Sequence, residues 1–128
     1  MITSRALHDL LPHVAELAQA FIEKCNEAGI SIIITSTYRD VEAQDALYAQ
    51  HPKVTNAKGG ESFHQYRVAF DFVPLSNGKP VWDDYRLFKR CGEIGESLGL
   101  EWAGRFHSFP ESCHFQATGG KTIADFKK

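Results

Sequence analysis

The sequence predicts an α+β fold in which a small, mainly antiparallel sheet packs against three helices. Three segments carry apolar residues at helical spacing, and the short runs between them are β-branched or alternate between apolar and polar residues. A turn-forming Ser-Asn-Gly-Lys run at residues 76–79 joins two of these short runs, which is typical of a hairpin. Because hairpins connect antiparallel strands, this mixture favours α+β over a parallel array of strands and helices.

Residues 12–28 are predicted to form the first helix. Apolar side chains recur three and four residues apart from Val14 to Cys25, a proline occupies the first position, and Gly29 is a typical C-terminal stop. The next six residues, 30–35, are β-branched and nearly all apolar, and they are too few for a second helix. They predict a buried strand.

Asp40 is a typical N-cap for a second helix over residues 41–50, which ends before Pro52. Residues 51–60 contain turn formers and show little periodicity, so they predict an exposed loop at the rim of a cleft.

Residues 68–74 alternate and predict a strand. Val68, Phe70 and Phe72 fall on one face, and Asp71 falls on the other. A carboxylate placed among apolar neighbours is costly to bury alone, so we expect Asp71 to face water or to meet a cation.

The third helix is predicted over residues 85–98, capped by Asp83 or Asp84 and ended by a glycine. Short strands are expected at residues 100–102 and 114–116, followed by a short terminal helix.

The chain has 128 residues, 43% of them hydrophobic, with 14 Lys+Arg against 16 Asp+Glu. This length suits one hydrophobic core, so we expect a single domain over residues 1–128. The formal net charge of −2 and the lack of a basic stripe argue against nucleic acid as a partner. No apolar stretch approaches the ~20 residues of a membrane span. We expect a monomer that does not insert into membranes.

Three residues have the chemistry of a metal site. His64, Asp71 and His114 offer two imidazoles and one carboxylate, a set of three ligands that leaves a fourth position of a catalytic zinc ion open. Such a combination also arises by chance among solvated or hydrogen-bonded side chains. The same ligand set is found in iron oxygenases.

A resemblance sharpens this interpretation. Three separated segments resemble, in order, the motifs of the zinc D-alanyl-D-alanine carboxypeptidase and L-alanyl-D-glutamate peptidase family, which includes several phage endolysins. The matching residues are Ser36, Tyr38, Arg39, Gln44, Leu47 and Tyr48 in the first segment, Ser62, His64, Ala69 and Asp71 in the second, and Trp102, Gly104, Glu111 and His114 in the third. The chain departs from the family at Arg67 and Ala103, where glycine is usual, and Arg67 raises the question of the backbone conformation there.

The resemblance implies that His64, Asp71 and His114 bind one zinc ion per chain. It implies that Glu111 is the acid and base that takes a proton from water and passes it to the leaving amine. Arg39 would donate hydrogen bonds to the substrate and to the developing oxyanion. From the residues alone, Glu111 could equally be an exposed loop residue and Arg39 a surface arginine.

Further substrate contacts are expected from Arg39 together with four residues in or near the motifs: Gln44, Ser62, Trp102 and His107. The aromatic residues Phe106, Phe109 and Phe115 are instead expected in the core.

The three cysteines are odd in number and lack C-x-x-C spacing, so we expect reduced thiols. Cys25 and Cys91 fall on apolar helix positions and predict small buried side chains. Cys113 precedes His114 along a strand, so its side chain should point away from the site.

The resemblance implies a peptidase that cleaves peptidoglycan stem peptides, and we favour an L-alanyl-D-glutamate endopeptidase of phage or prophage type. The alternatives are a D-alanyl-D-alanine carboxypeptidase or dipeptidase, and a non-catalytic zinc-containing module that binds the cell wall. The N-terminal residues lack the apolar run of a signal peptide. We therefore expect synthesis in the cytoplasm and action in the periplasm or cell wall after release by another protein.

Overall fold

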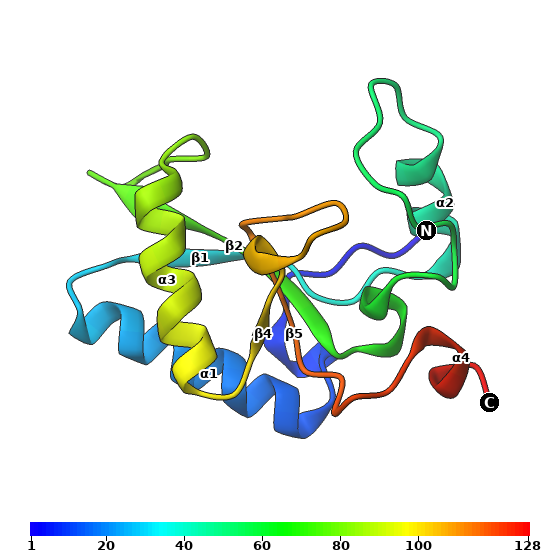
Figure 1. Cartoon of the computed structure of the whole chain (residues 1–128), viewed down its shortest axis with the longest axis horizontal. Coiled ribbons are helices and arrows are strands. Elements are labelled where there is room, and N and C mark those ends of the chain that lie inside the picture. The colour runs from blue at the N-terminus through cyan, green and yellow to red at the C-terminus, as the bar shows by residue number, and fades with distance from the viewer.

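A computed structural model describes all of residues 1–128, and its central strand is also its longest (Figure 1). This strand, β2 (Ala69–Ser76), lies between β1 (Ile32–Ser36) and β5 (His114–Gln116), and β4 (Glu101–Trp102) pairs with the far side of β5. A short β3 (Lys79–Pro80) pairs back onto the end of β2. Every pairing is antiparallel, so the predicted α+β fold with an antiparallel sheet and a hairpin at residues 76–79 is confirmed.

The helices divide into two groups. α1 (Pro12–Glu27) and α3 (Tyr85–Ser97) contact each other and lie together against the sheet (Figure 1). α2 (Val41–Tyr48) lies apart from them, near the N-terminus, and α4 (Ile123–Phe126) is a single turn close to the C-terminus. The predicted packing of helices against an antiparallel sheet is confirmed, and α1 and α3 make its main contacts with the strands. None of these helices is long and apolar enough to cross a membrane.

An aromatic cluster fills the space between the sheet and α1. Phe70 and Phe72 of β2 are fully buried, together with Phe115 of β5 and Phe21 of α1. The Phe21 ring lies 5.1 Å from the Phe72 ring and 4.8 Å from the Phe115 ring, centroid to centroid, both edge-on. Edge-on aromatic pairs contribute about 0.5–1.5 kcal/mol each beyond the area that they bury. The predicted core face of β2 is confirmed.

The N-terminal residues hold the segment that follows β1. Thr3 bridges Arg39 in antiparallel fashion, the Ser4 amide donates to the Tyr38 carbonyl at 2.8 Å, and the Thr37 amide donates to the Ser4 carbonyl at 2.8 Å. The start of the chain thereby fixes the backbone of Thr37 and Arg39.

Arg67 adopts the left-handed conformation, with φ 65°, at a position where a glycine would be unstrained. Its guanidinium lies 3.9 Å from the centre of the Tyr38 ring, and its Nη1 donates to the Asp9 carbonyl at 2.9 Å. These contacts offset the cost of the backbone conformation. The departure from the family's glycine therefore leaves the turn into β2 intact.

Two glycines inside α3 allow close packing. A Cβ added at Gly92 would lie 2.3 Å from the Trp102 ring, and one added at Gly95 would lie 2.3 Å from the Phe115 ring. Glycine costs a helix about 1 kcal/mol relative to alanine, so these positions are explained by packing against β4 and β5.

We predict that Gly95→Ala lowers the free energy of unfolding by about 1–3 kcal/mol, because overpacking against Phe115 outweighs the gain in helix propensity. Urea denaturation measures the change, with Glu93→Ala, on the exposed face of the same helix, as the control. A more stable Gly95→Ala protein would contradict this account.

Candidate active site

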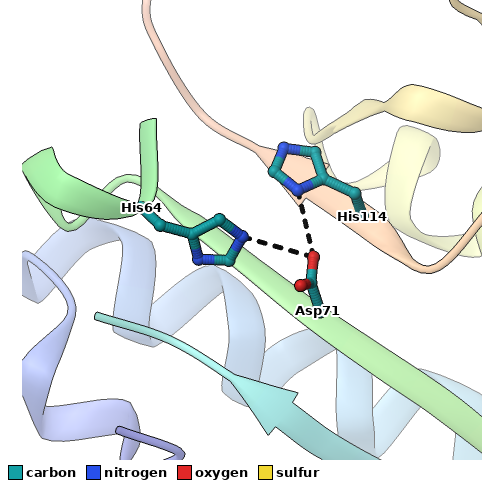
Figure 2. A group of neighbouring side chains, drawn as sticks. All are labelled: His64, Asp71 and His114. Atoms are coloured by element: carbon teal, nitrogen blue, oxygen red, sulfur yellow. Dashed lines mark hydrogen bonds and ion pairs between the residues drawn. The ribbon is translucent and has the colours of Figure 1, made fainter. Parts of the chain in front are cut away.

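The three predicted metal ligands come together at one end of the central strands (Figure 2). Asp71 on β2 is directly opposite His114 on β5, and His64 is supplied by a short 3₁₀-helix, Phe63–Tyr66. The Asp71 Oδ1 atom lies 3.0 Å from His114 Nδ1 and 3.3 Å from His64 Nε2. One donor atom from each residue lies within 4.8 Å of the others, so the group could hold a metal ion.

Hydrogen bonds on the far sides of the two rings set which nitrogens face the centre. His64 Nδ1 lies 2.6 Å from the Thr37 carbonyl, which can only accept, so this nitrogen carries the proton. His114 Nε2 lies 2.9 Å from Gln116 Oε1, and the Gln116 amide nitrogen in turn donates to Glu101 Oε1 at 3.4 Å. With His64 Nδ1 and His114 Nε2 used in this way, the other nitrogen of each ring faces Asp71 and is the one that would bind a metal ion once unprotonated.

The centre of this group suits a cation. His64 Nε2 is buried and has no hydrogen-bond partner. When the facing nitrogen of His114 is also unprotonated, two nitrogen lone pairs and a carboxylate oxygen converge, and a divalent cation among them satisfies all three. Two imidazoles and one carboxylate are the donors of a catalytic zinc site with an open position.

Burial and the charges of neighbouring groups shift the pKa values of His64, Asp71 and His114. Burial lowers the pKa of His64, which keeps the ring neutral. Burial alone would raise the pKa of Asp71, but His64 and His114 outweigh it and hold that pKa well below its usual range. Burial would likewise lower the pKa of His114, yet the hydrogen bond and charge of Asp71 raise it overall. The carboxylate thus attracts positive charge to the centre of the group.

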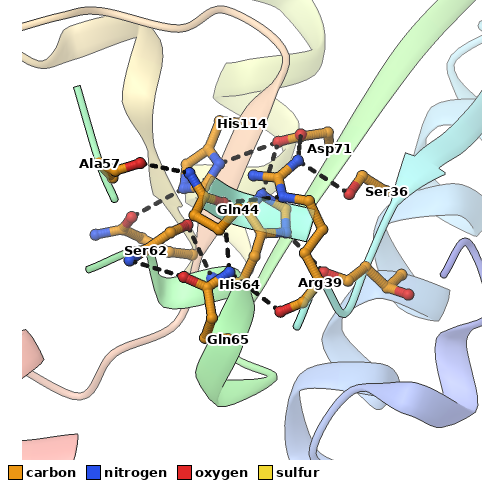
Figure 3. A network of polar contacts seen from close by, with 11 residues as sticks. Ser36, Arg39, Gln44, Ala57, Ser62, His64, Gln65, Asp71 and His114 are labelled. Carbon is orange, nitrogen blue, oxygen red and sulfur yellow. Dashed lines mark hydrogen bonds and ion pairs between the residues drawn. The ribbon is translucent and has the colours of Figure 1, made fainter. Parts of the chain in front are cut away.

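Arg39 lies against the second oxygen of Asp71 (Figure 3). Its Nη1 is 3.7 Å from Asp71 Oδ2 and donates to Ser36 Oγ at 3.3 Å, and its Nε donates to Gln44 Oε1 at 3.2 Å. The side chain is only 15% exposed, yet it lines the cavity beside the three ligands. The guanidinium is therefore held in place and still accessible to a bound molecule.

Gln44, which was expected to bind substrate, is not among the residues that line this cavity. It is fully buried, and besides accepting from Arg39 it donates to the Ala57 carbonyl at 2.9 Å and accepts from Gln65 at 3.3 Å. Its side-chain amide is occupied by hydrogen bonds within the protein. These bonds hold Arg39 and the loop at residues 49–62 in place. Ser62 does line the cavity, where its hydroxyl accepts from the His64 amide and caps the 3₁₀-helix.

Trp102, also expected to contact substrate, is likewise buried, at 2% exposed, and lines neither cavity, so it lies behind the site. Its indole nitrogen donates to the Ser112 carbonyl at 2.8 Å, which anchors the chain between Glu111 and His114. His107 is exposed on the loop that follows Trp102, outside the residues that line the cavities.

Glu111 lines the same cavity as the three ligands and Arg39. Its amide donates to the Ala103 carbonyl at 3.1 Å, and its carbonyl accepts from the His114 amide at 3.3 Å. Burial raises the pKa of its carboxyl. A raised pKa brings a carboxylate closer to the range in which it can both take and return a proton.

Cys113 contributes no nucleophile. It lies in the turn just before β5, and its side chain packs against the hydrophobic core, as expected from the sequence; burial raises the pKa of its thiol. Cys25 and Cys91 are fully buried, and all three cysteines are free thiols, in agreement with the sequence.

The cavity has a volume of about 320 Å³ and opens between two loops. One wall comes from residues 54–63, which confirms the predicted rim, and the other includes Phe106 and Glu111. Phe106 is 39% exposed and Phe109 is 37% exposed, so the prediction that they belong to the core is wrong; Phe115 alone of the three is buried.

Comparison with known proteins decides the family. A family model described as D-alanyl-D-alanine carboxypeptidase matches residues 55–117. The peptidoglycan L-alanyl-D-glutamate endopeptidase CwlK of Bacillus subtilis is 34% identical over 122 residues, covering 84% of this chain and 73% of CwlK. The chain belongs to this peptidase family. The resemblance stated from the motifs is confirmed.

Solved structures show that the fold is that of the same peptidases. The L-Ala D-Glu endopeptidase ChiX of Serratia marcescens superposes with a TM-score of 0.70 at 17% identity, over 91% of this chain and 89% of ChiX. The D,D-pentapeptidase VanY, whose structure is a complex with Zn(II), gives a TM-score of 0.64 at 16% identity, over 93% of this chain and 84% of VanY.

Within this peptidase fold, Gln116 is a site residue that the motifs did not single out. It lies two residues after His114, and alternate residues of a strand share a face, so the predicted strand at residues 114–116 already placed it beside the ligand. Glu101 continues the chain of hydrogen bonds from β4 and also accepts from the amide and hydroxyl of Thr118, both at 2.9 Å.

We predict that Gln116→Ala weakens binding of a divalent metal such as Zn²⁺ by about 10–100-fold, because His114 loses the acceptor that fixes its ring. Competition with a chromogenic chelator measures the affinity. Gln19→Ala, on the exposed face of α1, is the control and keeps wild-type affinity. Unchanged affinity in Gln116→Ala would show that β5 alone orients the ring.

Proposed function

We propose that this chain is a zinc-dependent peptidase that cleaves peptidoglycan stem peptides, with the bond between L-alanine and D-glutamate as its target. The observation that carries the proposal is the convergence of His64, Asp71 and His114 in a cavity that also contains Glu111 and Arg39. The 34% identity to CwlK, an L-alanyl-D-glutamate endopeptidase, supports the choice of bond.

In this proposal one zinc ion is held by His64 Nε2, Asp71 and His114 Nδ1. When bound, zinc polarises the scissile carbonyl and lowers the pKa of water to about 7. Glu111 takes a proton from the attacking water at its carboxylate and delivers it to the nitrogen of the leaving amine. Its raised pKa fits both steps, since the carboxyl must hold the proton between them.

Arg39 has a second role in the same reaction. Its guanidinium is held by Ser36, Gln44 and Asp71, and it faces the cavity. A fixed cation of this kind stabilises the negative charge that develops on the carbonyl oxygen during attack, because it needs no reorganisation at that moment. Its Nη1 also lies 3.7 Å from Asp71 Oδ2, within the distance of an ion pair.

The shape of the site favours an endopeptidase over the D-alanyl-D-alanine carboxypeptidase alternative. A second, open cavity continues beyond Glu111, and in this proposal it takes the residues on the leaving-amine side of the scissile bond. This leaves room for several residues after the scissile bond, whereas a carboxypeptidase must end its site at a terminal carboxylate. Digestion of purified walls with and without a chelator, followed by mass spectrometry of the new amino termini, tests the bond that is cut.

We predict that Glu111→Gln retains zinc and the fold while hydrolysis falls by about 10²–10⁴-fold, because the amide cannot accept the proton of water. Zinc content is measured by elemental analysis, and hydrolysis by release of new amino termini from walls.

Two further variants separate Glu111 from the ligands. His64→Ala and Asp71→Asn should both lose zinc, since a site with three ligands has no spare donor. A zinc-replete and active Glu111→Gln enzyme would overturn the mechanism. A zinc-replete wild type that binds walls and releases no new amino termini would instead favour the non-catalytic wall-binding alternative.

We predict that Arg39→Ala lowers kcat by about 10²–10³-fold with zinc content unchanged, because the oxyanion loses its fixed cation. Arg39→Lys keeps the charge but loses the planar fork that meets Ser36 and Gln44 together, so it restores only part of the rate. Steady-state kinetics on a stem peptide measure both variants. Wild-type kcat in Arg39→Ala would leave the arginine with a structural role alone.

Such a substrate lies outside the cytoplasm, in the cell wall. We also propose that the protein is made in the cytoplasm and reaches the wall after release by another protein, as in phage lysis. It would act as a monomer with a single domain over residues 1–128.

A further inference from the structure

A second cavity of about 580 Å³ extends from the catalytic cavity between the loops at residues 55–61 and 106–111. The two cavities share five lining residues: Thr55, Ala57, Glu61, Phe106 and Glu111. They therefore form one continuous groove, and we call its second part the outer groove.

Glu111 fixes which part of a substrate enters the outer groove. The zinc ligands and Arg39 line only the first cavity, and Glu111 lines both. In the proposed reaction Glu111 protonates the leaving nitrogen, so the residues attached to that nitrogen extend past Glu111 into the outer groove. For the bond between L-alanine and D-glutamate, the first of these residues is D-glutamate.

The outer groove is lined by more carboxylates than cationic side chains. Two carboxylates line it, those of Glu61 and Glu111, and a ligand that carries a carboxylate is repelled by both. Glu61 is paired with Lys127 at 2.6 Å. Lys58 is the one cationic side chain that lines the outer groove; it is exposed and has no ion pair within the chain.

The position of Lys58 is set by its loop. Its Nζ lies 5.9 Å from the centre of the Tyr48 ring, and the following residue, Gly59, donates its amide to Asp45 Oδ1 at 2.8 Å. Both partners belong to α2, so the helix holds the lysine at the groove. Phe106 and Phe109 form the opposite, apolar wall, and Phe109 keeps its place there despite a φ of 49°.

We propose that Lys58 determines specificity by binding the carboxylate of the residue on the amine side of the scissile bond. D-Glutamate in a stem peptide is linked through its side-chain carboxyl, which leaves its α-carboxylate free to meet the lysine. The ammonium group favours a carboxylate over a carboxamide, because only the carboxylate forms a charge-assisted hydrogen bond. This inference rests on the proposed function and adds the residue that recognises the substrate's carboxylate.

Two synthetic stem peptides test the proposal, one with D-glutamate and one with D-isoglutamine, which differ only in that α-carboxylate or carboxamide. The enzyme loaded with zinc is assayed on both, and kcat and KM are obtained separately. The variants are Lys58→Ala and Lys58→Arg. Lys53→Ala is the matched control, because Lys53 Nζ lies 5.7 Å from the same Tyr48 ring but lines neither cavity.

We expect the wild type and Lys53→Ala to favour the D-glutamate peptide by about tenfold in kcat/KM, mainly through KM. Lys58→Ala should lose this preference, and Lys58→Arg should keep most of it.

Three results would overturn the inference. Cleavage of both peptides by the wild type at equal efficiency, or a preference that persists in Lys58→Ala, rejects the role of Lys58 and leaves the proposed function standing. Failure of the zinc-loaded wild type to cleave either peptide rejects the proposed function itself.

Discussion

The burial of one carboxylate, Asp71, governs the rest of the structure. It lies on the central strand between Phe70 and Phe72, which point into the aromatic core, and its own side chain is only 14% exposed. An isolated buried charge costs several kcal/mol, so the opposite face of the strand has to supply compensation. His64, His114 and Arg39 supply it, and the same arrangement that stabilises the carboxylate creates a place for a divalent cation.

His64, His114 and Arg39 can stabilise the Asp71 carboxylate because each of them is oriented by a hydrogen bond on the side away from Asp71. Thr37 holds His64 through a carbonyl, Gln116 holds His114 through an amide, and Gln44 holds Arg39. The Thr37 carbonyl is itself fixed by pairing with the N-terminal residues. Donors with fixed orientation lose little freedom when a ligand binds, so the site is organised before metal or substrate arrives.

The sequence predicted that His64, Asp71 and His114 come together, as the structure shows, but it did not predict which residues surround them. Alternation along residues 68–74 predicted that Asp71 would be separated from the core, and three ordered motifs identified its partners. Whether a motif residue touches substrate depends on burial, which spacing does not encode. Gln44 is buried because the loop after α2 folds back over it. Phe106 and Phe109 are exposed because the backbone from 103 to 111 turns outward, which apolar character alone could not reveal.

Core packing and the catalytic site are connected through Trp102. Gly92 lets α3 approach the indole ring, Gly104 lets the chain turn over it, and the indole nitrogen holds the Ser112 carbonyl. Ser112 lies between Glu111 and His114, so the separation of the proposed acid and the proposed ligand depends on a side chain of the core. Protein interiors are densely packed and transmit displacement. The small residues in α3 therefore matter to the site as well as to the fold, because a shift of Trp102 would move the segment that carries both groups.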